Sequence, residues 1–410
     1  MNLPRLLCLA AAAALFSGCA SAPQPAPPAI SPAIVLVSID GLRADALDLG
    51  LTPTINALAA RGVRAEAMTP SYPSLTFPNH YTLVTGLRPD RHGIINNTMH
   101  DAALGGFKLS DLAAVGNAAW WGGEPIWVGA EKAGIKTATG SWPGSEAPIQ
   151  GIRPQLSRPY DETVAPADRV EQILEWITPA DGSAPPRLLT LYLEQVDKAG
   201  HAYGPESVQY RDAVQRADAA VGQLVQGLAA RHVLDSTNII VVSDHGMATV
   251  KPGQQVAVED MVPAALAKVI STGQSVGFEP LPGKEAKARA ALIGRHSHYQ
   301  CWDKAALPTA WHYGTHPRIP SIICQMDEGW DALPRVALAS RGARERGSHG
   351  YAPTLPSMQA MFVAAGPSFQ QGKRLPRFDN VDVYPMLAQL LGVTPADHDG
   401  DVQALKPALR

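Results

Sequence analysis

Charged residues are scarce in this sequence, at 17% of 410 residues, and no long run carries a single sign. The 34 basic and 37 acidic residues nearly balance, so the chain lacks the strong positive field that binding to duplex nucleic acid requires. Its apolar runs are all shorter than the roughly 20 residues of a membrane-spanning helix. The composition therefore predicts no duplex nucleic-acid partner and no spanning segment in the body of the chain.

Aromatic residues are also few, at 6%, but hydrophobic residues reach 46%. That much apolar material can build a large buried core, which excludes intrinsic disorder and fibrous architectures. The 36 glycines and 36 prolines indicate many loops between the regular elements. We therefore expect a loop-rich globular protein.

The amino terminus has the pattern of an export signal. Arg5 precedes an apolar run of eleven residues from Leu6 to Phe16, and small residues then lead to Cys19. Three interpretations remain open: a lipoprotein signal that makes Cys19 the lipid-modified first residue, ordinary secretion with cleavage nearby, or an uncleaved anchor or core helix. Residues 1–19 are the expected signal, and the Pro/Ala-rich residues 20–32 are an extended linker. We expect an exported, periplasmic protein, with a lipid anchor to the outer membrane at Cys19 as its only link to a membrane.

Cysteine is rare, with four residues in the whole chain. Removing Cys8 with the signal and using Cys19 for lipid leaves Cys301 and Cys324 in an oxidising compartment. They form either a disulfide, contributing on the order of 3 kcal/mol, or two unrelated buried thiols.

From residue 33 onward, strands alternate with helices, which predicts an α/β fold: a mainly parallel sheet with helices on both faces. Continuous apolar runs at 34–39, 188–193 and 239–242 predict strands buried on both sides, and another strand is expected at 360–364. Pro205 is expected to open an amphipathic helix that runs to Leu228, and a helix over 382–391 should end at Gly392. Residues 250–345 break the alternation, so we expect an inserted subdomain within a catalytic domain of residues 33–410.

An aspartate follows each of the three apolar strands: Asp40, Asp197 and Asp244. Because the carboxyl ends of parallel strands share one edge, these carboxylates should converge where such sheets bind ligands. His201 lies four residues after Asp197, and His245 directly follows Asp244. A single strand-end aspartate is more often a turn or cap residue, but three with two histidines favour a metal site, and zinc is the metal that this mixture of oxygen and nitrogen ligands selects.

A second pattern is the proline-punctuated segment PSYPSLTFPNH at 70–80. It predicts that Thr76 lies at or just before the amino terminus of a helix, where free N–H groups stabilise an anion. A helix cap formed by Ser74 or Thr76 is the simpler interpretation of this segment taken alone.

Together these motifs resemble bacterial members of the nucleotide pyrophosphatase/phosphodiesterase family, within the alkaline phosphatase superfamily. The resemblance covers VSIDGLR at 37–43, PSYPSLTFPNHY at 70–81, TGLRPDRHGI at 85–94, NNTM at 96–99, DKAGH at 197–201, SDHGM at 243–247 and SHG at 348–350. These blocks follow one another through nearly the whole predicted domain.

The resemblance implies an alkaline-phosphatase-like fold and a site for two Zn²⁺ ions. One ion is held by Asp40, Thr76, Asp244 and His245, and the other by Asp197, His201 and His349. Further residues with implied roles are Thr76 as nucleophile, Asn97 as donor to a phosphate oxygen, and Phe77 and Tyr160 on either side of a nucleobase. Six further histidines are expected either to form structural hydrogen bonds or to be exposed to solvent: His80, His92, His296, His298, His312 and His316.

The activity implied by the resemblance is zinc-dependent hydrolysis of nucleotide phosphodiester and pyrophosphate bonds through a phosphothreonyl intermediate, releasing nucleoside 5′-monophosphates. Leu75 departs from the lysine that many animal relatives carry before the threonine. The alternatives are a phosphodiesterase or phosphonate hydrolase of the same superfamily with non-nucleotide substrates, and an exported zinc-binding protein without turnover. A sulfatase is disfavoured because its cysteine- or serine-based motif is absent near residue 76.

Overall fold

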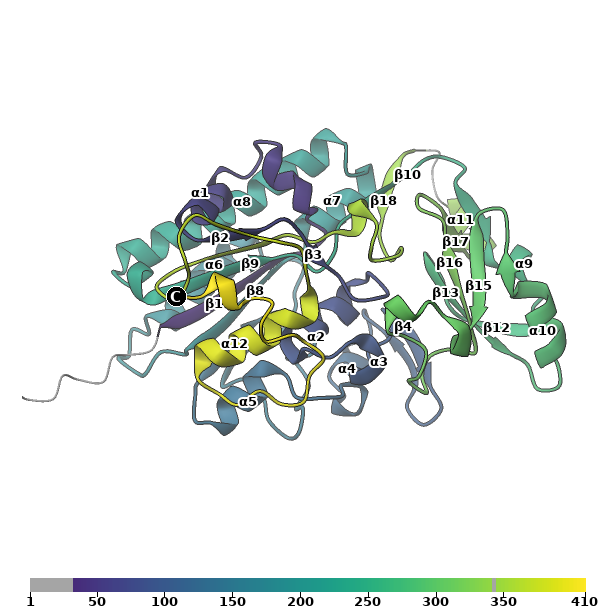
Figure 1. Cartoon of the computed structure of the whole chain (residues 1–410), viewed down its shortest axis with the longest axis horizontal. Coiled ribbons are helices and arrows are strands. Elements are labelled where there is room, and N and C mark those ends of the chain that lie inside the picture. The colour runs from purple at the N-terminus through teal and green to yellow at the C-terminus, as the bar shows by residue number, and fades with distance from the viewer. Residues whose placement is uncertain (1–31, 341–343) are drawn as a thin grey trace, which may run out of the picture. The chain divides into compact units, whose positions relative to one another are not determined.

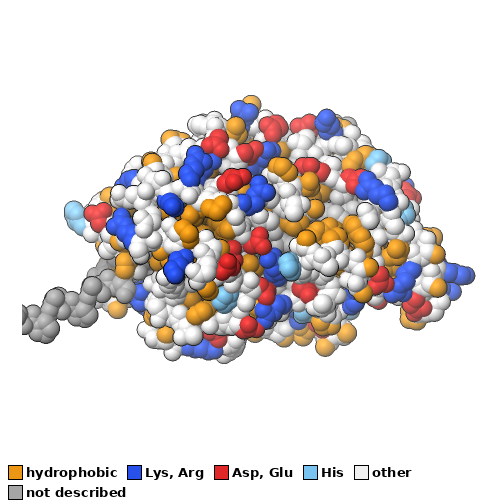
Figure 2. All heavy atoms as spheres, in the orientation of Figure 1, with side chains coloured by type: hydrophobic (Ala, Val, Ile, Leu, Met, Phe, Trp, Pro, Cys, Tyr) orange, Lys and Arg blue, Asp and Glu red, His pale blue; other side chains and the backbone are white. Residues whose placement is uncertain are grey.

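The computed structural model describes residues 32–340 and 344–410 of the chain. The predicted signal, Cys8, Cys19 and nearly all of the predicted linker lie outside these residues. Among the described helices, none combines the length and the apolarity that crossing a bilayer demands. On the face drawn in Figure 2, side chains of both charge signs are interspersed, as the balanced composition suggests.

The described residues contain an eight-stranded sheet that carries the predicted strands (Figure 1). The strand order is β20 (Lys373–Leu375), β2 (Val63–Ala65), β19 (Phe362–Ala365), β9 (Thr237–Val242), β1 (Ala33–Ile39), β8 (Leu188–Leu193), β6 (Thr137–Gly140) and β7 (Leu156–Arg158). Neighbours are parallel except where β19 pairs antiparallel with β9 and with β2. The predicted α/β fold with a mainly parallel sheet is confirmed.

Helices cover both faces of this sheet because the central strands are apolar on both sides (Figure 1). Val35, Val37 and Ile39 of β1 pack with α1 (Pro53–Arg61), α6 (Pro166–Ile177) and α8 (Val208–Ala230). Ile34 and Leu36, on the opposite face, belong to the core that includes α2 (Thr76–Thr85), α5 (Ile126–Lys132) and α12 (Val383–Leu391). Strand β1 therefore contributes side chains to two apolar cores, one on each face of the sheet.

Helix ends follow the expected chemistry with one correction. Gly392 ends α12 in the left-handed region at φ +73°, as predicted. Helix α8 begins at Val208 rather than at Pro205, because the Ser207 side chain accepts a hydrogen bond from the Tyr210 N–H and caps the helix there. Pro205 instead lies in the turn that follows α7 (Gln195–Tyr203).

A smaller antiparallel sheet lies within residues 267–326. Its order is β12 (Ala267–Ser271), β13 (Ser275–Pro280), β16 (Ile322–Met326), β15 (Tyr299–Asp303) and β14 (Gly294–Arg295). Helices α9 (Val258–Met261) and α10 (Glu285–Leu292) lie beside it and complete a separate apolar core (Figure 1). Short strand pairs β10 (Ala248–Val250) with β18 (Arg346–Ser348), and β11 (Gln255–Ala257) with β17 (Asp331–Leu333), lead into and out of this region.

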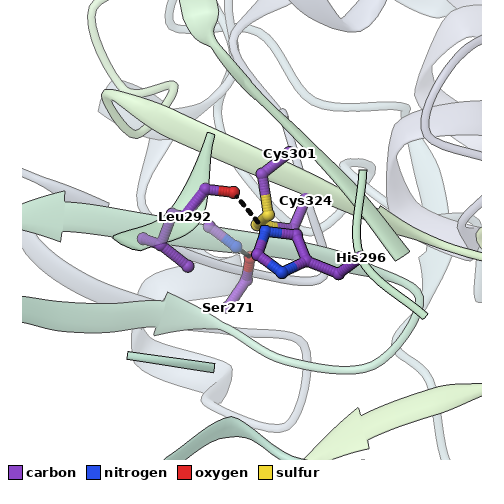
Figure 3. Close-up of a disulfide and its surroundings, with 6 residues drawn as sticks. Ser271, Leu292, His296, Cys301 and Cys324 are labelled. Atoms are coloured by element: carbon purple, nitrogen blue, oxygen red, sulfur yellow. Dashed lines mark hydrogen bonds between the residues drawn. A yellow bond between two sulfur atoms is a disulfide. The ribbon is translucent and has the colours of Figure 1, made fainter. Parts of the chain in front are cut away.

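Cys301 and Cys324 are directly opposite each other on β15 and β16, with their Cα atoms 3.9 Å apart, and they form a disulfide. Of the two interpretations of these cysteines, the disulfide is the one observed. Figure 3 shows the bond beside His296, whose ring contacts the Leu292 carbonyl oxygen at 2.7 Å. The disulfide joins two residues of the small sheet that are 23 positions apart in the sequence.

Candidate functional site

The predicted site residues gather at the carboxyl edge of the large sheet. Asp40 directly follows β1, and Asp244 and His245 follow β9. Asp197 and His201 lie one turn apart on α7, which begins directly after β8. Thr76 is the first residue of α2, as predicted, and His349 directly follows β18. Five separate elements therefore supply the side chains.

Asp40, Asp244 and His245 form one candidate metal-binding group, with one ligand atom from each lying within 4.8 Å of the others. The Nε2 atom of His245 is 2.9 Å from Asp244 Oδ2 and 3.6 Å from Asp40 Oδ1. The Thr76 hydroxyl oxygen is 3.3 Å from the same Nε2 atom. All four residues predicted for one zinc ion are thus in contact around His245.

A second candidate group consists of Asp197, His245 and His349. His201 contacts it from the outer side: its Nε2 atom is 3.4 Å from Asp197 Oδ2 and 3.0 Å from His349 Nε2. The ring of His245 stacks on that of His349, with centroids 3.6 Å apart. The residues predicted for the other ion are therefore together, and His245 lies between the two sets.

The three histidines share a hydrogen-bonding arrangement that suits metal ligation. In each ring the Nδ1 atom contacts a backbone carbonyl oxygen: Gly347 for His201, Gly246 for His245 and Ser74 for His349. A carbonyl oxygen can only accept, so Nδ1 carries the proton and a neutral ring keeps the Nε2 lone pair for a ligand. Burial, together with His245 and His201, holds the pKa of His349 well below its ordinary value, which favours this neutral form.

The carboxylates provide a direct test of whether a cation fits. In the described part of the chain, Asp40 Oδ1, Asp197 Oδ1 and Asp244 Oδ2 are buried oxygens without a hydrogen-bond partner. Burial, followed by the charges of Asp244 and Asp197, raises the pKa of Asp40 well above its ordinary value. Buried carboxylates that face one another need a positive charge, so the donor set fits divalent cations.

A cleft of about 180 Å³ opens directly onto this edge. Its lining joins Asp40, Thr76 and Asp197 to Phe77 and Tyr160, so both residues predicted to contact a nucleobase border the cleft that contains Thr76. Phe77 meets the Phe107 ring edge to face and the Trp121 ring at a tilt of 38°, while Tyr160 is 36% exposed. The remaining lining residues are Leu109, Leu112, Val115, Ser141, Pro143, Glu146, Tyr192, Glu194 and Lys198.

Asn97 lies beside the start of α2. Its side-chain oxygen accepts a hydrogen bond from the Phe77 N–H at 3.0 Å, which orients the amide. With the oxygen used in this way, the NH₂ group remains as the donor. Of the first N–H groups of α2, that of Phe77 is used by Asn97 and Pro78 has none, so the Thr76 N–H is the donor that this end of the helix adds.

Two contributors to the site were not predicted from the sequence. The Tyr192 hydroxyl donates a hydrogen bond of 2.5 Å to Asp40 Oδ2, and His80 contacts Asp244 from behind. In the sequence, Tyr192 is one residue of an apolar strand, and nothing near it indicates a role in the site. His80 stood in the motif at 70–80, four residues after Thr76, but was assigned a structural role.

Comparison with known proteins reveals clear relatives. The model of the family described as type I phosphodiesterase / nucleotide pyrophosphatase matches residues 34–352. An uncharacterized pyrophosphatase/phosphodiesterase of Schizosaccharomyces pombe is 33% identical over 391 residues, which cover 92% of this chain and 80% of the relative. Ectonucleotide pyrophosphatase/phosphodiesterase family member 3 of Bos taurus is 34% identical over 96% of this chain but only 46% of its own length. The chain thus spans about half the length of that relative.

Solved structures of members of this family have the same fold as this chain. Murine ectonucleotide pyrophosphatase/phosphodiesterase 5, an inactive threonine-to-alanine variant in complex with AMP, superimposes with a TM-score of 0.87 at 31% identity. The match covers 92% of this chain and all of that chain. The human form of the same protein superimposes with a TM-score of 0.86 at 32% identity.

Proposed function

We propose that this chain, which belongs to the type I phosphodiesterase / nucleotide pyrophosphatase family, is an enzyme that hydrolyses phosphodiester and pyrophosphate bonds of nucleotides and releases nucleoside 5′-monophosphates. One observation carries the proposal: Thr76 lies both in contact with the Asp/His cluster and in the cleft bordered by Phe77 and Tyr160. A hydroxyl nucleophile, a set of metal ligands and two aromatic rings are thus within reach of one nucleotide.

The proposed cofactor is a pair of Zn²⁺ ions. Asp40, Thr76, Asp244 and His245 would hold one ion, and Asp197, His201 and His349 the other. This assignment is supported by the buried carboxylate oxygens that have no hydrogen-bond partner and by the Nε2 lone pairs that the three histidines keep when Nδ1 carries the proton. When bound, such ions lower the pKa of a coordinated hydroxyl or water and neutralise charge on phosphate oxygens.

The chain's own groups then account for the chemistry. The Thr76 hydroxyl oxygen gives up its proton to solvent and attacks phosphorus in line with the leaving oxygen, so a phosphothreonyl ester forms as that bond breaks and the departing alcohol or phosphate group takes up a proton from solvent. Water attacks the ester, releases the phosphate product and returns the proton to Thr76. The Asn97 amide and the Thr76 N–H would donate to the non-bridging oxygens, where negative charge develops. Phe77 and Tyr160 would hold the base, since every nucleobase presents a π face.

Charge balance favours diesters over monoesters. Two Zn²⁺ ions against three carboxylates leave a charge of about +1, which the Thr76 alkoxide cancels. No arginine occurs among the residues lining the cleft. A monoester dianion is best bound with an added guanidinium, whereas a diester monoanion needs none. We expect kcat/KM for a nitrophenyl nucleoside diester to exceed that for nitrophenyl phosphate, and comparable values would contradict this argument.

We also propose the cellular setting and domain organisation predicted from the sequence. Residues 1–19 would be a bacterial lipoprotein-like signal and residues 20–32 a linker. Residues 33–410 would be the catalytic domain, with an insertion around 250–345. Export to the periplasm agrees with the disulfide between Cys301 and Cys324. Mass spectrometry of the membrane-associated protein would reveal a lipid on Cys19, and an unmodified, soluble periplasmic form would exclude the anchor.

The decisive experiment is product analysis by mass spectrometry with a nucleoside triphosphate and a dinucleotide. Wild type should release nucleoside monophosphate from both, and Thr76→Ser should retain part of the activity, whereas Thr76→Ala should release none. The relative in complex with AMP supports this, since its inactive form carries a threonine-to-alanine substitution. A strong chelator should abolish hydrolysis and Zn²⁺ should restore it. Turnover of phosphonates or non-nucleotide diesters alone would identify the alternative activity.

A further inference from the structure

His80 is a completely buried histidine directly behind the candidate metal site. It lies on the first turns of α2, four residues after Thr76. Its Nδ1 atom is 2.9 Å from the Thr76 carbonyl oxygen and 3.3 Å from Asp244 Oδ2. On the other side of the ring, Nε2 is 2.8 Å from the hydroxyl oxygen of Ser38, in β1. One side chain therefore contacts the nucleophile residue, a proposed metal ligand and the central strand.

These contacts define where the proton of a neutral His80 ring resides. The Thr76 carbonyl and the Asp244 carboxylate can only accept, so Nδ1 must be the donor. Nε2 is then an acceptor, and the Ser38 hydroxyl is its donor. The neutral ring with its proton on Nδ1 donates its hydrogen bond to the Thr76 carbonyl oxygen and keeps the same N–H group 3.3 Å from Asp244 Oδ2, whose lone pairs remain available to a cation.

Aromatic rings hold His80 in this orientation. Trp142 and Tyr192 meet the imidazole edge to face, with centroids 5.2 and 5.0 Å away. The Trp142 indole N–H donates to the His80 backbone carbonyl at 3.1 Å. Tyr192 itself donates to Asp40, so the two buried carboxylates of the first metal group are each held from behind. Such a packed ring cannot turn to make other hydrogen bonds.

We propose that His80 is a positioning residue that couples the start of α2 to Asp244, so that the Thr76 hydroxyl and the Asp244 carboxylate keep one fixed relative placement. Its Nδ1–H group is the active part, and Ser38 selects the tautomer that carries it. The proposal rests on the proposed function for its kinetic consequences, but its effect on Zn²⁺ binding does not require that the enzyme turn over any particular substrate.

Two substitutions distinguish the hydrogen-bonding role of the His80 Nδ1–H group from the space that the side chain fills. Asparagine places its amide near the position of Nδ1, so His80→Asn retains a donor toward Thr76 and Asp244. Glutamine reaches the position of Nε2 instead, so His80→Gln loses that donor. The matched control is His92→Asn, because His92 is also buried but contacts Thr82 and the Ile94 N–H rather than any site residue. Circular dichroism and the thermal midpoint establish that each variant is folded.

The readouts are Zn²⁺ affinity by chelator competition and the separate values of kcat and KM for a nucleoside diester. We expect His80→Gln to lose about 10–100-fold in Zn²⁺ affinity and in kcat, with KM within about twofold, since the base-binding cleft is untouched. His80→Asn should recover most of both losses, and His92→Asn should match wild type.

The proposal is overturned if His80→Gln binds Zn²⁺ within twofold of wild type, or if His80→Asn is as impaired as His80→Gln. A wild type that binds Zn²⁺ but hydrolyses no nucleotide would refute the proposed function instead. The affinity comparison among the variants still decides the role of His80 in that case.

Discussion

Replacing Arg169 by methionine should destabilise the protein strongly, because this residue holds a buried ion pair. Its guanidinium donates to both carboxylate oxygens of Glu194, at 2.6 and 3.0 Å, and both side chains are at most 5% exposed. The same guanidinium donates to the carbonyls of Tyr192, Asp161 and Val164. It therefore ties the segment that follows Tyr160 to the end of β8.

The size of the loss in unfolding free energy depends on the charge of Glu194, which remains after Arg169 is replaced. Glu194 would keep its charge while only 5% exposed, with Lys198 Nζ, 3.6 Å from its Oε1 atom, as the remaining ion-pair partner, so breaking this buried pair should cost up to about 5 kcal/mol. Replacing Glu194 as well removes the stranded charge, so the double variant Arg169→Met/Glu194→Met should recover about 2 kcal/mol or more of the loss. The released segment directly follows Tyr160 and helps to place that ring, so KM for nucleotides should also rise.

Urea unfolding of the single and double variants, followed by circular dichroism at pH 7, measures this directly. The double variant is the internal control, because it lacks both hydrogen-bonding partners but strands no charge. If Arg169→Met lowers the unfolding free energy by less than about 1 kcal/mol, the ion pair is not buried in the way the contacts indicate. A double variant no more stable than the single one would equally refute the reasoning.

Three further predictions concern pH, the disulfide and the metal site. Burial raises the pKa of Asp382 from 3.8 to about 6, so the stability that its protonated form contributes is complete below pH 4 and is lost as the pH rises through 6. The Asp382→Asn variant does not titrate at this position, so its unfolding free energy in urea titrations should rise relative to that of wild type between pH 4 and 7. A difference between the two proteins that does not change with pH would exclude this. Replacing Cys301 and Cys324 by serine should lower the unfolding free energy by about 3 kcal/mol and retain hydrolysis, because neither cysteine is among the site residues; loss of hydrolysis in a folded variant would contradict this. Asp40→Asn should raise the thermal midpoint of the metal-free protein at pH 7, because it removes one of three carboxylates that face one another, and it should weaken Zn²⁺ binding. Calorimetry with and without Zn²⁺ measures both effects. A metal-free midpoint lower than that of wild type would contradict the first expectation.

Local sequence patterns predicted the central strands well. The apolar runs at 34–39, 188–193 and 239–242 became β1, β8 and β9, because a strand covered by helices on both faces must be apolar throughout. The same logic placed Asp40 and Asp244 together, since both follow parallel strands that end at one edge. Ser207 shows the limit of such patterns, because its cap rather than Pro205 sets the start of α8.

By itself, then, the sequence determined the mainly parallel sheet and the convergence of Asp40, Asp197 and Asp244 with His201 and His245. Strand ends can be located from local sequence patterns, and the carboxyl ends of parallel strands all lie at one edge of the sheet. It indicated His349 only through resemblance to a family, since no spacing rule connects this position to site residues that lie between positions 40 and 245. Only the tertiary structure decided that His80 contacts Asp244 and that Arg169 pairs with Glu194. Those contacts depend on how separate elements pack, and the identity of a buried polar residue does not by itself specify which distant partner satisfies it.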